Sequence, residues 1–106
     1  MNDTDTKNFE VRTIHPVIDK HDDNIDVVVR LVDGSRWGAT FITARNITTI
    51  MENYRETGEC LAGEFFWAKN MIVVRELTQE LLEKVVHELL GAGELESSFE
   101  LLESGA

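Results

Sequence analysis

The Asp33-Gly34 dipeptide constrains the fold of this chain more than any other feature of its sequence. It joins two segments that are rich in β-branched and aromatic residues, 25–32 and 36–42. Asp-Gly between two such segments is a strong hairpin signal, because the central residues of a type I′ turn need positive φ angles. The sequence therefore predicts an antiparallel hairpin at this point.

The geometry of that turn decides which side chains share a face of the sheet, because successive residues of a strand point to opposite faces. A regular two-residue turn places Arg30 on the same face as Trp37 and Phe41, and it leaves both faces substantially apolar. A one-residue bulge at Gly34 instead places Trp37 and Phe41 with Leu31, which restores a single core face. The sequence is compatible with both alternatives.

From their β-branched and aromatic composition, three further strands are predicted at residues 9–18, 64–68 and 71–76. The first of these belongs at an edge of the sheet, or carries a bulge, because Pro16 has no amide hydrogen to donate to a ladder. The last two would form a second hairpin around a turn at Lys69-Asn70.

Two helices are predicted, one after each hairpin. Thr43 and Thr78 are suited to cap their N-termini, and Gly58 and Gly91 are suited to end them. The first helix has an apolar face at i, i+3, i+4 and i+7, formed by Ile47, Ile50, Met51 and Tyr54. The predicted order is β-β-β-α-β-β-α, an α+β fold with a mostly antiparallel sheet of about five strands in one domain spanning residues 1–106.

The two ends of the chain are predicted to differ from this pattern. Residues 1–8 show no periodicity and are expected to form a flexible arm. Residues 92–106 hold four glutamates and no basic residue, and the spacing of Leu95, Phe99 and Leu102 suits a short acidic amphipathic helix or tail. That segment either packs on its own domain or docks on a second subunit or partner.

The charge balance narrows the classes of partner. The chain has 20 acidic and 10 basic residues and a formal net charge of −10. Such a surface argues against nucleic acid and against anionic membranes, both of which attract Lys and Arg. It suits a basic protein partner. Cys60 is the only cysteine, so no internal disulfide can form, and with a polar N-terminus this favours the cytoplasm.

The sequence offers no catalytic signature, and we predict a non-enzymatic protein without a metal site or cofactor. The cluster closest to a metal site holds His21, Asp22 and Asp23, three consecutive residues that lack any metal-ligand spacing. Cys60 has no base nearby in the sequence that would activate it as a nucleophile. An interaction protein is therefore the first functional hypothesis.

Aromatic residues and arginine are the usual anchors of protein interfaces. On that basis the tentative interface residues are Arg30, Trp37, Phe41, Trp67 and Phe99. The two helices cover both faces of the sheet if they lie on opposite faces; if both lie on one face, the other would be covered by the acidic tail, by a second copy, giving a homodimer, or by a partner. A further alternative is a small-ligand-binding or enzymatic domain with a pocket between helix and sheet, lined by Trp37, Tyr54, Cys60 and Trp67.

Two stretches carry a resemblance, GATFITARNI and TGEC-LAGEFFWAKNMIVV, within residues 36–77. They resemble a pattern found in small uncharacterised bacterial proteins, which we associate with the immunity proteins of polymorphic toxin systems. Such immunity proteins are often small, acidic and α+β. The resemblance implies a protein-binding role, for example as an acidic inhibitor of a basic toxin or enzyme. It contains no catalytic residues that could be carried over.

Overall fold

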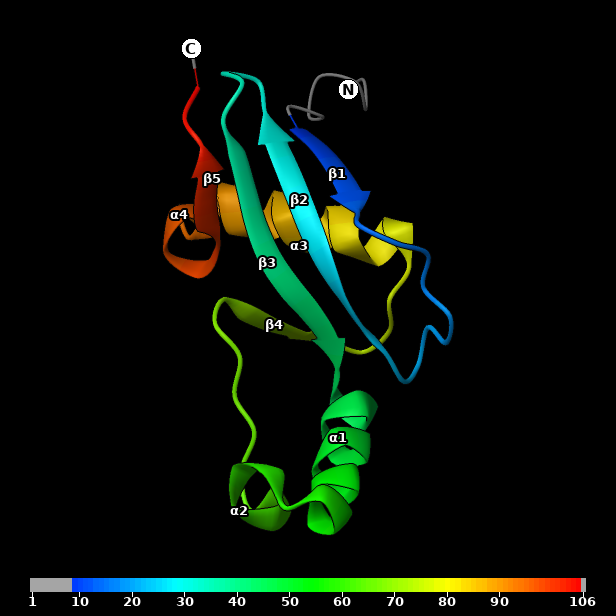
Figure 1. Ribbon diagram of the computed structural model, residues 1–106. Helices are drawn as coiled ribbons and strands as arrows, with labels where there is room; N and C mark the ends of the chain where they lie inside the picture. Colours follow the sequence, from blue (N-terminus) through cyan, green and yellow to red (C-terminus); the bar gives the residue numbers. More distant parts are fainter. Residues whose placement is uncertain (1–8, 106) are drawn as a thin grey trace.

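A computed structural model describes residues 9–105 and confirms the predicted α+β class, with five strands and four helices in that range (Figure 1). The strands are β1 (Phe9–Thr13), β2 (Asn24–Leu31), β3 (Arg36–Thr43), β4 (Met71–Val74) and β5 (Glu100–Glu103). The helices are α1 (Ala44–Thr57), α2 (Glu59–Gly63), α3 (Gln79–Gly91) and α4 (Leu95–Ser98). The flexible arm predicted at residues 1–8 lies outside the described residues.

The sheet is built around β3. Strands β1, β2 and β3 are consecutive antiparallel neighbours. Along the other edge of β3, β5 pairs antiparallel with Arg36–Gly38 and β4 pairs parallel with Thr40–Thr43. Strand β1 lies at an edge, as Pro16 predicts, and it ends before that proline.

The β2–β3 turn contains the bulge and not the regular two-residue turn. The amide of Leu31 donates to the carbonyl of Ser35 at 2.9 Å, and Gly34 has φ of +89°. Val29 therefore lies opposite Trp37. The Asp33 carboxylate accepts hydrogen bonds from the amide and hydroxyl of Ser35, at 2.9 and 2.6 Å, which fix the turn. The same hydrogen bonds hold the pKa of Asp33 below its usual value.

The bulge gives the sheet one core face, which α3 and α4 cover. Figure 1 shows α3 crossing behind β1, β2 and β3. The buried side chains that meet there are Val11, Ile25, Val27, Val29, Ala39, Phe41, Val74, Leu77, Leu82, Val86, Leu95 and Phe99. The rings of Phe41 and Phe99 meet edge to face, with their centroids 6.0 Å apart.

The strand predicted at residues 64–68 is wrong, and so is the second hairpin. That segment has no strand structure, and Lys69-Asn70 forms a turn that leads from it into β4. Strand β4 pairs parallel with β3 because the chain returns to the sheet through a long crossover that contains α1 and α2. Strand β4 pairs with β3, and residues 64–68 do not pair with it.

The described part of the acidic segment at residues 92–106 packs on its own domain, which is one of the two predicted alternatives. It forms α4 and β5 in place of one amphipathic helix. Leu95 and Phe99 are buried in the core, whereas Leu102 extends over the opposite face of the sheet against Gly38. The fifth strand thus comes from the C-terminal segment.

Both predicted helix caps are confirmed. The hydroxyl of Thr43 accepts a hydrogen bond from the amide of Asn46 at 3.1 Å, and that of Thr78 accepts one from Leu81 at 3.2 Å. Gly58 ends α1 with φ of +87°. The two helices differ in position, however. Helix α3 covers the core face, and α1 extends beyond the end of the sheet (Figure 1), in a molecule measuring 50 × 26 × 24 Å.

Candidate functional site

Two surfaces stand out as candidates for binding, and the first is the part of the chain that extends beyond the sheet. We call residues 44–70 the arm; it comprises α1, α2 and the segment that returns to β4. The apolar face predicted for α1 is present, yet its four residues are only half-buried. The one buried residue of α1 is polar, Asn46. The arm therefore contributes little to the core.

A polar network fixes the base of the arm. The Asn46 amide nitrogen donates to Asp22 at 2.8 Å, and the Asn46 oxygen accepts from the side chain of Asn24 at 2.8 Å. The hydroxyl of Thr49 donates to the other carboxylate oxygen of Asp22 at 2.9 Å. The hydrogen bonds from Asn46 and then Thr49 lower the pKa of Asp22, because they stabilise its charged form.

The far end of the arm has an unusual backbone. Cys60, Leu61 and Ala62 have φ angles of +51°, +54° and +56°, so α2 contains a turn of left-handed helix. Such a conformation costs about 1–2 kcal/mol per residue for L-amino acids, so the surrounding structure must hold it in place. Gly63 packs directly against the backbone carbonyl of Met51 in α1. The turn is thus seated on the helix.

The surface of the arm is both apolar and acidic. The Leu61 side chain is 73% exposed and Trp67 is 68% exposed, and Phe65 is exposed as well. Phe66 lies between the last two and instead packs on Tyr54, with ring centroids 6.4 Å apart. Residues 56–68, at the far end of the arm, carry the exposed carboxylates of Glu56, Glu59 and Glu64 and no basic residue, whereas Glu52 pairs with Arg55, and Arg45 and Lys69 lie nearer the sheet.

The second surface is the face of the sheet opposite the core, which we call the open sheet face. It carries a concavity of about 710 Å³ near the β2–β3 turn and another of about 430 Å³ beside it, with Ile14 and Val28 lining both. Leu102 lines the second concavity, and Gly38 leaves room for it. The larger concavity is lined mostly by charged and polar side chains, and the second one has the more apolar lining.

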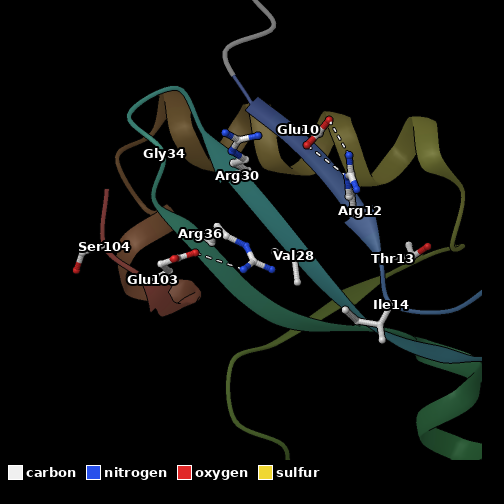
Figure 2. A pocket seen from close by; sticks show the side chains of 10 residues that line it. All are labelled: Glu10, Arg12, Thr13, Ile14, Val28, Arg30, Gly34, Arg36, Glu103 and Ser104. Carbon is white, nitrogen blue, oxygen red and sulfur yellow. Dashed lines mark hydrogen bonds and ion pairs between the residues drawn. The ribbon is translucent and has the colours of Figure 1, made fainter. Parts of the chain in front are cut away.

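Three arginines project from this face around the larger concavity, Arg12, Arg30 and Arg36 (Figure 2). Arg12 pairs with Glu10 and Arg36 pairs with Glu103, each at 3.3 Å. Arg30 has no ion pair within residues 9–105, and it lies directly opposite Arg36 in the ladder. Like charges in facing positions destabilise a sheet. With Glu10 and Glu103 counted, the lining of the larger concavity carries a net charge of +1 in a chain whose net charge is −10.

The structure does not bring the five predicted interface residues together. Phe41 and Phe99 are core residues, 0% and 3% exposed, and Trp37 is half-buried against the same core. Arg30 is exposed on the open sheet face, and Trp67 is exposed on the arm. Because the bulge turns Trp37 and Phe41 inward, they part from Arg30. Two of the five predicted interface residues are therefore exposed, Arg30 and Trp67, and they lie on two different surfaces.

Two features of these surfaces were not predicted from the sequence, the arginines that share the open sheet face and the left-handed turn in the arm. If the turn has a bulge, the alternation of side chains along the strands places three arginines on one face, Arg12, Arg30 and Arg36. Nothing in the sequence signals the left-handed turn at Cys60–Ala62, because positive φ angles are uncommon outside glycine. None of the concavities described here is lined by the four residues predicted to form a pocket between helix and sheet.

Residues 9–105 contain neither a cluster of metal ligands nor a membrane-spanning helix. No group of three or more His, Cys, Asp or Glu side chains there is placed to hold a metal ion. In the same residues, no helix has both the length and the apolar character needed to span a membrane.

Comparison with known proteins adds no relative: no protein-family model, curated protein or solved structure matches the chain. The immunity-type resemblance of residues 36–77 stays a prediction.

Proposed function

We propose that this protein is a non-enzymatic interaction protein that binds a basic protein partner through its arm. The observation that supports this proposal is the exposed, acidic and apolar surface of residues 56–68 at the far end of the arm. Exposed Trp and Leu side chains surrounded by carboxylates suit a partner whose cationic rim surrounds an apolar pocket. The excess of acidic residues would raise the association rate with such a partner.

The way the arm is built supports a binding role. Its base is fixed by the Asp22–Asn46 network and its far end by the seat of Gly63 on α1. A surface held in one conformation loses little entropy on binding. An acidic inhibitor of the immunity type, acting in the cytoplasm where a single free cysteine stays reduced, fits these properties.

Capture from an extract of the native host tests the proposal, with the chain immobilised as wild type or as Trp67→Ala. A basic protein should bind the wild type and dissociate at high salt. Its affinity for Trp67→Ala should fall roughly 30-fold, because an aromatic anchor contributes about 2 kcal/mol or more.

Val32→Ala is the matched control, since Val32 is exposed on the β2–β3 turn at the other end of the sheet. It should retain the partner fully. Proteins that bind wild type and Trp67→Ala equally well would refute binding through the arm.

The arginines on the open sheet face favour a second candidate, the binding of a small carboxylate or phosphate compound. A concavity of about 710 Å³ falls in the size range of ligand pockets, roughly 300–1,000 Å³. A thermal-shift screen of di- and tricarboxylates and phosphate esters tests this. Stabilisation that Arg30→Ala abolishes would support it, and the absence of any shift would exclude it for the compounds screened.

A further inference from the structure

The open sheet face and the arm have complementary chemistry. The open sheet face offers the arginines of the larger concavity and, beside them, the apolar side chains of Ile14, Val28 and Leu102 in the second concavity. The arm offers carboxylates beside exposed Leu61 and Trp67. We propose that the arm of one copy docks on the open sheet face of a second copy, and that each copy does so reciprocally. This pairing rests on the proposed use of the arm as a binding element.

Charge is the first argument for a second copy. Arg30 lies opposite Arg36 in the ladder and, unlike Arg12 and Arg36, has no ion pair within residues 9–105. A carboxylate from another chain placed between these two guanidinium groups would relieve their repulsion and form charge-assisted hydrogen bonds. The pairs of Arg12 and Arg36 with glutamates of the same face are largely exposed, and exposed pairs of this kind contribute little. The arginines therefore remain available to an incoming acid.

The apolar surfaces are the second argument. Leu61 and Trp67 are exposed in the single chain, and so is half of Leu102. Docking would remove all three from water. A stable pair needs about 800 Å² from each partner, which is a small share of the 7081 Å² accessible surface of the chain.

The position of the two surfaces in the molecule is the third argument. The larger concavity lies by Gly34, at the β2–β3 turn, and the arm extends from the opposite end of the sheet (Figure 1). A twofold rotation about an axis perpendicular to the long axis therefore brings each arm to the other copy's concavity. Both contacts form together, and the pair is closed.

A charge exchange tests this pairing. Arg30→Glu gives the open sheet face an acid in place of its unpaired arginine, and the double variant Glu59→Lys, Glu64→Lys makes the arm basic. Alone, each variant sets like charges against each other in both contacts of the pair, and self-association should weaken roughly 100-fold relative to wild type. Mixed in equal amounts, the two variants match charges in both contacts, so a mixed pair should form. Light scattering after size exclusion measures the mass in each case.

Matched controls place the same charge changes elsewhere. Arg75→Glu and the double variant Glu80→Lys, Glu88→Lys alter exposed residues outside both surfaces, and they should pair as the wild type does. Circular dichroism tests whether each variant is folded. Formation of the mixed pair shows that both variants can still associate.

Three results would overturn the pairing: a monomeric wild type, pairing of the single variants at wild-type strength, or a mixture that stays monomeric. A monomeric wild type that still captures a basic partner through Trp67 would leave the proposed function standing. In that case the open sheet face would be left to an acidic segment of a different protein.

Discussion

A single buried asparagine makes the junction between the arm and the sheet. Asn46 bonds to Asp22 and Asn24, so the only buried side chain of α1 is held by polar contacts. A buried amide with its donors and acceptors paired fixes an orientation more sharply than apolar packing does. The direction in which the arm extends is thus decided by a few hydrogen bonds.

Acid should therefore loosen the arm before it unfolds the sheet. The pKa of Asp22 lies below its ordinary value of 3.8 in the folded chain. Its stabilising contribution is consequently complete above pH 3.8 and is lost as the pH falls through the lowered pKa. Amide hydrogen exchange of α1, corrected for intrinsic rates, should accelerate in that acidic range while exchange of β2 and β3 stays slow.

Two variants check that this acid response belongs to Asp22. Asp22→Asn should remove the response, and Glu56→Gln, which removes an exposed charge from the same helix, should preserve it. Loss of protection in α1 and the central strands at the same pH would contradict a separate junction.

Helices and strands form at the predicted positions where a few neighbouring residues, such as a cap or a proline, determine them. Thr43 and Thr78 cap their helices, Gly58 ends α1, and Pro16 keeps β1 at an edge. Strand pairing is different, because it depends on which edge the rest of the chain leaves free. Residues 64–68 have strand composition but lie in the irregular segment that leads into β4, whereas the acidic C-terminal segment pairs with β3 and forms β5.

The two candidate surfaces could be predicted only in part, because they too depend on how the strands pair. Of the five residues that the sequence suggested for an interface, Arg30 and Trp67 are exposed, and both alternatives for the turn at Gly34 were compatible with the sequence. It could not choose between those turns, because the choice depends on a hydrogen bond between Leu31 and Ser35. That one choice buries Phe41 and leaves Arg30 facing Arg36.

The close packing of α2 on α1 at Gly63 leads to a prediction about stability. Gly63 has φ of +86°, and a β-carbon there would overlap the carbonyl oxygen of Met51. Gly63→Ala should therefore destabilise the chain by about 2 kcal/mol. Gly91→Ala should instead stabilise it by about 0.5 kcal/mol, because Gly91 has open space around it in α3. Denaturant unfolding measures both changes, and equal effects of the two substitutions would refute the seat.

The whole molecule is polarised along its long axis. At one end the sheet presents three arginines around a concavity, and at the other end an acidic and apolar arm extends into solvent (Figures 1 and 2). Helices α3 and α4 cover one face of the sheet, and in the single chain the other face remains open. An elongated monomer with complementary ends is suited to closed pairing with itself, and also to exchanging that pairing for a different basic partner.

The most direct measurement is an isotope-filtered NOE experiment on a concentrated mixture of labelled and unlabelled chains, which detects only contacts between copies. Docking of the arm on the open sheet face predicts intermolecular NOEs from the indole protons of Trp67 to methyl groups of Ile14, Val28 or Leu102. The absence of intermolecular NOEs, or NOEs that join arm to arm, would contradict the pairing.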